Sequence, residues 1–221
     1  MPLFPLVRHI SNIVSRGLIR MPVTPNQITT TSILLGLAAA AALLLNTRTG
    51  DIACGVLLTV SYVLDNCDGD VARAKKLSSR FGALLDTFGD WLVHSVLFIA
   101  LGIAAFQRTG DDTWLWLGLA ASAGGTINYA IGLMKDLQSD KAPPPDYNPA
   151  SEGEFKRPAQ NDSLGKWLAF VFRELARADF CFIVLVLAAL NWLAYLLPFA
   201  AIGAQVYWIT FFIVRNEKYH V

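Results

Sequence analysis

Residues 65–90 read DNCDGDVARAKKLSSRFGALLDTFGD, and this stretch decides how the rest of the chain is interpreted. It lies between apolar segments, yet it holds five aspartates. Ionisable side chains in membrane-spanning helices are costly, so they are candidate functional residues. Helical spacing places two sets of residues on two helix faces: Asp65, Asp68, Gly69, Ala72 and Arg73 on the first, and Gly82, Asp86 and Asp90 on the second. Asp70 lies off the first of these faces.

The two faces should meet, because only a short basic segment, 75–80, separates the two helices. A short connection predicts that the helices are antiparallel neighbours. Asp68 and Asp86 are equidistant from Leu77, and Asp65 and Asp90 have their midpoint just after it. We therefore expect all four carboxylates to lie together near one end of the helix pair.

Four clustered carboxylates repel one another strongly in a low dielectric, and the single arginine among them, Arg73, does not compensate that charge. Carboxylate oxygens suit hard divalent cations such as Mg²⁺, Mn²⁺ or Ca²⁺. Two such ions about 4 Å apart form the clamp used in phosphoryl transfer. Arg73 would then pair with a phosphate. Small residues on the same faces let a ligand approach the backbone, although in membrane helices they also serve close packing.

Composition places this motif in a membrane protein. The chain has 221 residues, of which 54% are hydrophobic and 16% charged, and its mean hydropathy is +0.45. These values disfavour a disordered chain. The net charge of +1 gives no basic excess for nucleic acid. Three widely spaced cysteines are neither a disulfide framework nor a zinc site. We expect one integral membrane domain over residues 1–221.

Six apolar segments are candidate membrane spans, so the predicted fold class is all-α and multi-pass. They cover residues 27–46, 51–73, 81–106, 113–134, 180–197 and 199–214. Pro198 separates the last two, because a single helix of that combined length would be too long for one span. Domain 1–221 thus divides into 27–135 with four spans and the motif, a proline-rich cytoplasmic loop at 136–165, and 166–221 with two spans.

The loops predict the orientation of the chain. With six spans, sixteen lysines and arginines lie on one side, and only Arg48 and Arg108 lie on the other. The positive-inside rule then places both termini and the carboxylates near the cytoplasmic face. Residues 2–22 carry apolar and basic side chains on different helix faces, which indicates an amphipathic helix in the membrane interface. The alternative is an ordinary helix packed on a soluble neighbour.

The spacing Asp65-x2-Asp68-Gly69-x2-Ala72-Arg73-x8-Gly82-x3-Asp86-x3-Asp90 resembles the signature of the CDP-alcohol phosphotransferase family, also called CDP-alcohol phosphatidyltransferase class I, with every position occupied. The run Thr24-Pro25-Asn26-x-Ile28-Thr29 resembles the entry to the first span of many members. The resemblance implies six spans after an interfacial helix. It also implies transfer of a phospho-alcohol group from a CDP-alcohol donor to a hydroxyl acceptor, with release of CMP, in phospholipid biosynthesis.

The resemblance also implies roles for single residues. Four aspartates would hold two divalent cations, Mg²⁺ or Mn²⁺, and Asp90 would also be the general base: Asp65, Asp68, Asp86 and Asp90. The CDP moiety would contact a set that overlaps with these: Asp65, Gly69, Ala72, Arg73 and Gly82. Cys67 occupies a position that the signature leaves free, and we interpret it as a packing residue.

The acceptor site is less clearly marked. Arg173 and Arg177 lie where the fifth span begins and are candidates for binding an acceptor phosphate, although snorkelling positive-inside charge explains them equally well. Asn128 and Tyr129 are weaker candidates. CDP-diacylglycerol is the favoured donor, and CDP-inositol, which would give a di-inositol phosphate-type solute, is the alternative. Membrane lipid is an expected partner. Family members commonly form dimers, so a homodimer is also expected.

Two functions from other classes compete with this one. An ion transporter with an acidic intramembrane site would explain clustered aspartates. It would explain neither Arg73 among them nor their depth near one face rather than at the midplane. A non-catalytic membrane scaffold with a degenerate site is disfavoured because no signature position has been lost.

Overall fold

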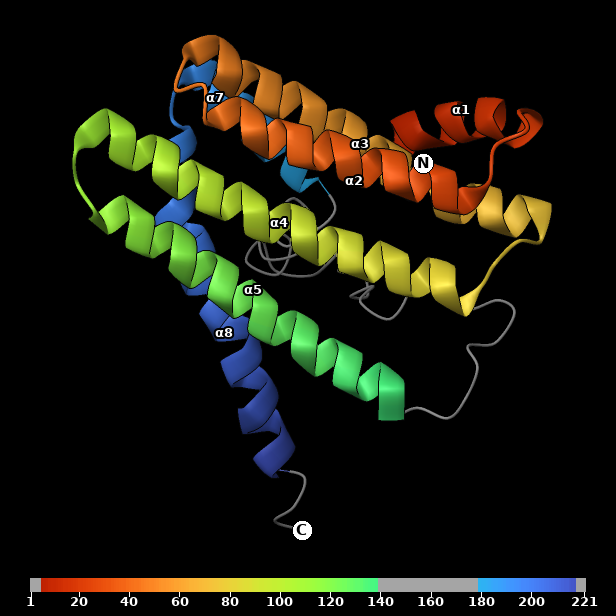
Figure 1. Cartoon of the computed structure of the whole chain (residues 1–221). Coiled ribbons are helices and arrows are strands. Elements are labelled where there is room, and N and C mark those ends of the chain that lie inside the picture. Colours follow the sequence, from red (N-terminus) through yellow and green to blue (C-terminus); the bar gives the residue numbers. More distant parts are fainter. Residues whose placement is uncertain (1–4, 139–178, 218–221) are drawn as a thin grey trace, which may run out of the picture.

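The computed structural model describes residues 5–138 and 179–217, and this part of the chain contains helices and no strand. Figure 1 shows long helices packed along one another. In chain order they are α1 (Leu6–Arg20), α2 (Pro25–Leu43), α3 (Arg48–Lys75), α4 (Arg80–Thr109), α5 (Thr113–Gln138), α7 (Phe180–Leu190), the short 3-10 helix η2 (Leu193–Tyr195) and α8 (Leu196–Glu217). The all-α prediction is confirmed for these residues.

Three stretches of the described residues are long and apolar enough to cross a membrane: Pro25–Leu43, Arg80–Thr109 and Thr113–Met134. They coincide with the first, third and fourth predicted spans. Helix α3 contains the second predicted span, with the charges of the signature in its later half. Helix α7 has 11 residues, fewer than the roughly 20 that a span requires. The number of six spans therefore stays a prediction.

The break between the last two predicted spans was placed at Pro198, and this is wrong. Helix α7 ends at Leu190, and Asn191 follows it with a left-handed φ of 63°. The Trp192 amide then donates to the Leu187 carbonyl at 2.8 Å, which closes the helix end. Pro198 lies instead in the first turn of α8. Proline is tolerated there because that amide would have no intrahelical acceptor.

Helix α2 packs against both α3 and α4 (Figure 1). Helices α3 and α4 are antiparallel, as predicted, and joined by residues 76–79. Their backbones make few close contacts, and the two helices meet mainly through side chains such as Tyr62 and His94. Small residues on α2 allow its close approach: a Cβ on Gly36 would lie 2.6 Å from the Val93 side chain. Ser61 donates a hydrogen bond to the Ser32 carbonyl at 2.7 Å. Helix α2 thus packs on both α3 and α4, the helices that carry the signature, and determines their spacing.

Helix α1 packs on α3 through Val7, Ser11 and Ser15. Cys67 is fully buried there with its thiol on the Ser11 carbonyl, in agreement with its interpretation as a packing residue. The N-terminus of α1 has no cap from its own sequence. Instead, the buried Asp179 carboxylate accepts hydrogen bonds from the amides of residues 6 and 7, both at 2.8 Å. A residue directly before α7 thus anchors the start of α1.

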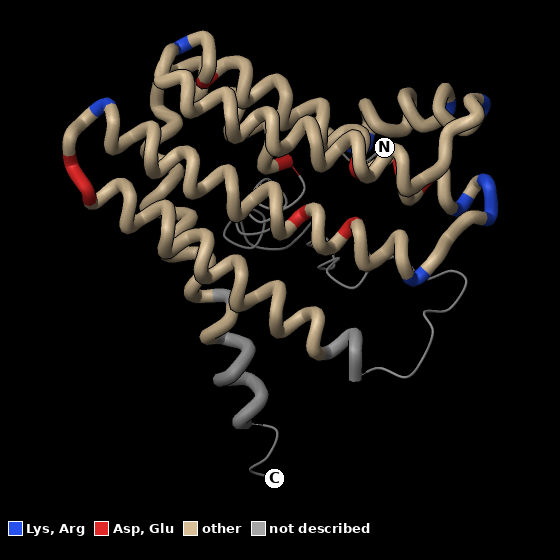
Figure 2. The backbone as a smooth tube through the Cα atoms, in the orientation of Figure 1, with Lys and Arg blue, Asp and Glu red and all other residues tan. Residues whose placement is uncertain are grey.

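The apolar side chains Ile10 and Ile13 of α1 are 43% and 72% exposed, so they do not face the protein. The location of α1 in a membrane interface is untested and stays a prediction. Figure 2 shows basic residues near the helix ends, and α1 together with residues 73–80 carries most of those that the structure describes. The opposite end of the bundle carries Arg48 and Arg108. The predicted asymmetry is therefore a spatial one, while the side that faces the cytoplasm stays a prediction.

Candidate active site

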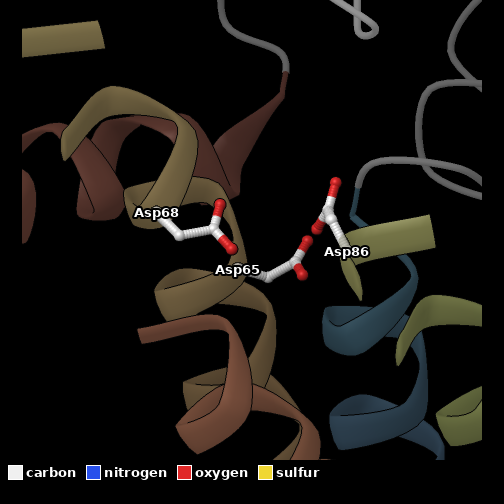
Figure 3. Close-up of side chains that lie close together, drawn as sticks. All are labelled: Asp65, Asp68 and Asp86. Carbon is white, nitrogen blue, oxygen red and sulfur yellow. The ribbon is translucent and has the colours of Figure 1, made fainter. Parts of the chain in front are cut away.

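Carboxylates from α3 and α4 converge as the sequence predicts. Asp65, Asp68 and Asp86 each offer one carboxylate oxygen, and these three atoms lie within 4.8 Å of one another. Figure 3 shows Asp65 and Asp86 pointing toward each other from the two helices, with Asp68 one turn further along α3. Asp68 is buried, and the other two are partly buried. The acidic faces of α3 and α4 thus meet between the two helices.

Asp90 lies one turn beyond Asp86 on α4 and is not part of this group of three. It lines a small cavity together with Asp65, with a volume of about 10 Å³, which suits one water molecule. It also lines a pocket of about 320 Å³ between α4, α5 and α8, whose walls include Trp91 and Tyr129. Asp90 therefore stands between the gathered carboxylates and a space large enough for part of a substrate.

Asp68 has a hydrogen-bond donor on α2. The Thr29 hydroxyl donates to the Asp68 carboxylate, and Thr29 is only 3% exposed. Thr29 is positioned by the start of α2, where Thr24 and Gln27 form a capping box and Pro25 is the first helical residue. The sequence pattern included Thr29 in the run at the entry of the first span but assigned it no role. A polar residue one turn after a helix start, on the buried face, was the signal that could have identified it.

His94, one turn after Asp90 on α4, makes two hydrogen bonds next to the carboxylates. The His94 ring nitrogen Nδ1 is 2.6 Å from the backbone carbonyl of Asp90, and Nε2 is 2.6 Å from the Tyr62 hydroxyl. Because a carbonyl only accepts, Nδ1 carries a hydrogen, and in the neutral ring the Tyr62 hydroxyl donates to Nε2. The Phe180 ring, at the start of α7, packs against both. These three side chains connect α3, α4 and α7 next to the carboxylates.

The remaining signature residues lie at the same end of the helices. A Cβ on Gly69 would lie 3.3 Å from Arg73 Nη1, so the guanidinium packs over this glycine. A Cβ on Gly82 would lie 3.1 Å from the Asn26 side-chain oxygen, so Gly82 lets the starts of α2 and α4 approach each other. Ala72 is partly buried, and Arg73 forms an ion pair with Asp70 at 2.7 Å. Asn26 is a second residue at the α2 entry that received no role from the sequence.

The group of carboxylates fits a hard divalent cation. Its donors are oxygen atoms only, and within residues 5–138 and 179–217 no histidine or cysteine belongs to the group. Carboxylates favour Mg²⁺ or Mn²⁺ over softer ions. Among the side chains that the structure describes, no lysine or arginine forms an ion pair with Asp65, Asp68, Asp86 or Asp90. The site can therefore hold a divalent metal ion.

The predicted acceptor residues Arg173 and Arg177 lie outside the described residues, as do loop 136–165 in most of its length and the segment before Asp179. The weaker candidates are both described. Asn128 donates to the Ala204 carbonyl at 3.1 Å and so connects α5 with α8. The Tyr129 ring stacks on Trp91 with centroids 5.0 Å apart and lines the larger pocket. Tyr129 is thus placed near Asp90, whereas Asn128 makes a contact between helices.

Comparisons with known proteins agree with this geometry. Residues 22–137, more than half of the chain, match the family model described as CDP-alcohol phosphatidyltransferase. That match contains α2, α3, α4 and nearly all of α5, and thus every residue of the signature.

Several curated proteins are similar to part of the chain. The chain is 37% identical over 113 residues to an archaetidylinositol phosphate synthase of Pyrococcus horikoshii, which is 51% of this chain and 58% of that protein. It is 38% identical over 89 residues to a phosphatidylinositol phosphate synthase of Corynebacterium glutamicum, 40% of this chain and 39% of that protein.

A bifunctional IPC transferase and DIPP synthase of Thermococcus kodakarensis is 32% identical over 122 residues, 55% of this chain but only 26% of that protein. The chain thus spans between about a quarter and three fifths of the length of these relatives. On the match over residues 22–137, the chain belongs to the CDP-alcohol phosphatidyltransferase family.

Proposed function

We propose that this protein transfers a phosphatidyl group from CDP-diacylglycerol to a hydroxyl of an inositol phosphate acceptor and releases CMP. The observation that carries the proposal is the convergence of Asp65, Asp68 and Asp86 within 4.8 Å, beside a pocket lined by Asp90. The inositol phosphate acceptor is supported by the names of two relatives, an archaetidylinositol phosphate synthase and a phosphatidylinositol phosphate synthase. The lipid donor suits a chain with apolar helices of membrane-spanning length.

Asp65, Asp68, Asp86 and Asp90 would hold two divalent cations. When bound, such ions supply positive charge that neutralises the pyrophosphate and the CMP that leaves. The oxygen of the acceptor forms a bond to the phosphorus of the phosphatidyl group. The bond from this phosphorus to the bridging oxygen breaks, and that oxygen departs with CMP. The attack is direct, because no separate nucleophile is evident among the described residues at the site.

Asp90 takes the proton of the acceptor hydroxyl. Its position supports this role, since it lies beside the group of three carboxylates and faces a pocket of about 320 Å³. Gly69, Ala72, Arg73 and Gly82, together with Asp65, contact the CDP moiety. Arg73 is exposed and retains N–H groups for a phosphate beyond the one that it donates to Asp70. Arg173 and Arg177 bind the acceptor phosphate in this proposal.

The carboxylate end of the bundle faces the cytoplasm, and both termini lie on that side. The basic residues at this end support the orientation. On α1, the exposed Ile10 and Ile13 lie next to Arg16 and Arg20, which suits a helix in the interface of an anionic membrane. A homodimer belongs to the same proposal, and chemical cross-linking in membranes tests it.

The decisive experiment is CMP release by the purified protein with Mg²⁺ and CDP-diacylglycerol. Inositol phosphate, inositol, glycerol phosphate and serine are supplied one at a time, and CDP-inositol replaces the lipid donor in a parallel reaction. We expect CMP release that depends on inositol phosphate. Release with another acceptor would replace the proposed acceptor, and release only from CDP-inositol would replace the donor. No release from either donor would refute the transferase function.

A further inference from the structure

Asp70 is the aspartate of the signature region that lies off the carboxylate face, and the structure directs it toward α1. Its Oδ1 accepts hydrogen bonds from Arg73 at 2.7 Å and from Arg8 at 3.3 Å. Its Oδ2 accepts from the Ser15 hydroxyl at 3.0 Å and from Arg8 at 3.4 Å. The Asp70 side chain is only 17% exposed. One carboxylate thus connects two residues of α1 with the signature arginine.

Arg73 depends on this contact for its orientation. Its side chain is 44% exposed, and within the described part of the chain Asp70 is its sole ion-pair partner. A long exposed arginine otherwise samples many rotamers, and ordering it on binding costs free energy. The contact with Asp70 and the packing over Gly69 hold the guanidinium in one place before any ligand arrives.

Arg8 keeps this arrangement electropositive. A single aspartate beside Arg73 would cancel its charge, but the two arginines around Asp70 leave one net positive charge. Arg8 also donates to the Asn66 carbonyl on α3 at 3.3 Å. Its helix begins with two amides bound to the Asp179 carboxylate. Helix α1 therefore places a cation beside Asp70.

We infer that Asp70 is a positioning residue for Arg73, and that α1, through Arg8, helps to recognise the phosphates of a cytidine diphosphate group. This inference rests on the proposed function, in which Arg73 contacts the CDP moiety. It assigns α1 a role in substrate binding in addition to its proposed place at the membrane surface. The competing explanation is an ion pair that only holds α1 on α3.

Two matched variants on α1 separate these explanations. Arg8→Gln and Arg16→Gln remove the same charge from the same helix, but Arg16 forms no ion pair among the described residues. The measurement is the Kd of the purified protein for CDP with Mg²⁺, along with kcat and KM for the CDP-alcohol. Arg8→Gln is expected to raise the Kd and the KM about fivefold with little change in kcat. Arg16→Gln should leave all three unchanged.

The Asp70→Asn variant completes a double-mutant cycle. We expect it to raise the Kd for CDP by a similar factor and to diminish the effect of Arg8→Gln when the two are combined. Equal effects of Arg8→Gln and Arg16→Gln would overturn the inference. So would an undiminished effect of Arg8→Gln in the Asp70→Asn background, or tighter CDP binding by Asp70→Asn alone.

Failure of the transferase function gives a different result, since the unmodified protein would then neither bind CDP nor release CMP. Failure of the inference leaves both intact. Thermal unfolding of each variant reports misfolding. If Arg8→Gln does not fold, Ser15→Ala removes one contact to Asp70 without removing charge and is expected to raise the Kd about twofold. An unchanged Kd in a folded Ser15→Ala protein would count against the inference.

Discussion

Buried aspartates have different partners at the two ends of the helix bundle. At one end, Asp51 is 1% exposed and meets Arg108 through two hydrogen bonds of 2.7 and 2.8 Å. This ion pair compensates the charge of Asp51. Arg108 also donates a hydrogen bond to the Asn46 side chain. At the other end, Asp65, Asp68 and Asp86 converge, and no described lysine or arginine forms an ion pair with them.

This difference distinguishes an ion pair that is complete within the chain from a group of carboxylates that can take a cation. A bidentate arginine completes Asp51 within the chain, and the pair connects α3 with the end of α4. The gathered carboxylates have no such partner among the described residues, and an external cation can supply it. Asp70 lies between these cases, since its charge is matched by two arginines, one of which belongs to the signature. The predictions below test whether the two ends differ in function as they differ in charge.

Removal of divalent cations should have the largest effect and should act on one end only. Excess chelator is expected to stop CMP release completely, because the carboxylates then have no cation to neutralise the phosphates. Added Mg²⁺ or Mn²⁺ should restore the reaction. The contribution of the Asp51–Arg108 ion pair to stability should not change on this treatment. The comparison would break down if the purified protein turned over substrate in excess chelator.

Asp90→Asn is expected to lower kcat by about 10² to 10⁴-fold, because an amide cannot take the proton of the acceptor hydroxyl. CDP binding should persist, since the other three carboxylates remain. Kinetics of CMP release and direct CDP binding measure the two properties separately. Near-normal kcat in this variant would remove the general-base role from Asp90.

Asp51→Asn should show the reverse behaviour. It leaves Arg108 without its charge partner, and we expect a loss of about 2 kcal/mol in stability, less than for a fully buried pair because the Arg108 side chain is 31% exposed. Thermal unfolding in detergent measures the loss. The protein that remains folded should keep its kcat. A lower kcat at full stability would show that the far end also takes part in the reaction.

Thr29→Val is expected to have the smallest effect of the four, a roughly tenfold weaker affinity for Mn²⁺, because Asp68 loses the hydroxyl that orients it. Thr29→Ser keeps the hydroxyl and should restore most of the affinity. Electron paramagnetic resonance of Mn²⁺ titrated into the protein measures binding without turnover. Equal affinities of the valine and serine variants would show that Thr29 contributes packing alone.

The sequence indicated the charged end of the protein correctly because helical periodicity is a local property. A period of 3.6 residues and a short connection are enough to bring Asp65 and Asp68 to the same level as Asp86. The same reasoning put Asp70 off this face, where the structure has it. It did not place α2 between α3 and α4, because packing partners depend on side-chain shapes on several helices at once.

The residues that support the site follow the same division. Thr29 reaches Asp68 across 39 positions of sequence, and Asp179 reaches the start of α1 across more than 170. The end of α7 at Asn191 depends on a left-handed turn that asparagine permits but does not require. Pro198 looked like the stronger breaker, yet a helix start accepts it without loss.

The sequence by itself determined the family signature, the helical class and the end of the bundle at which the carboxylates gather, since these follow from spacing along one chain. Only the tertiary structure decided which acids are matched. Asp51 and Asp68 are both buried aspartates of α3. One meets Arg108 from the far end of α4, and the other meets a threonine hydroxyl and two further carboxylates. A charge acquires its role from the groups that folding brings within a few ångströms of it, because electrostatic energy depends on distance in space and not on separation in sequence.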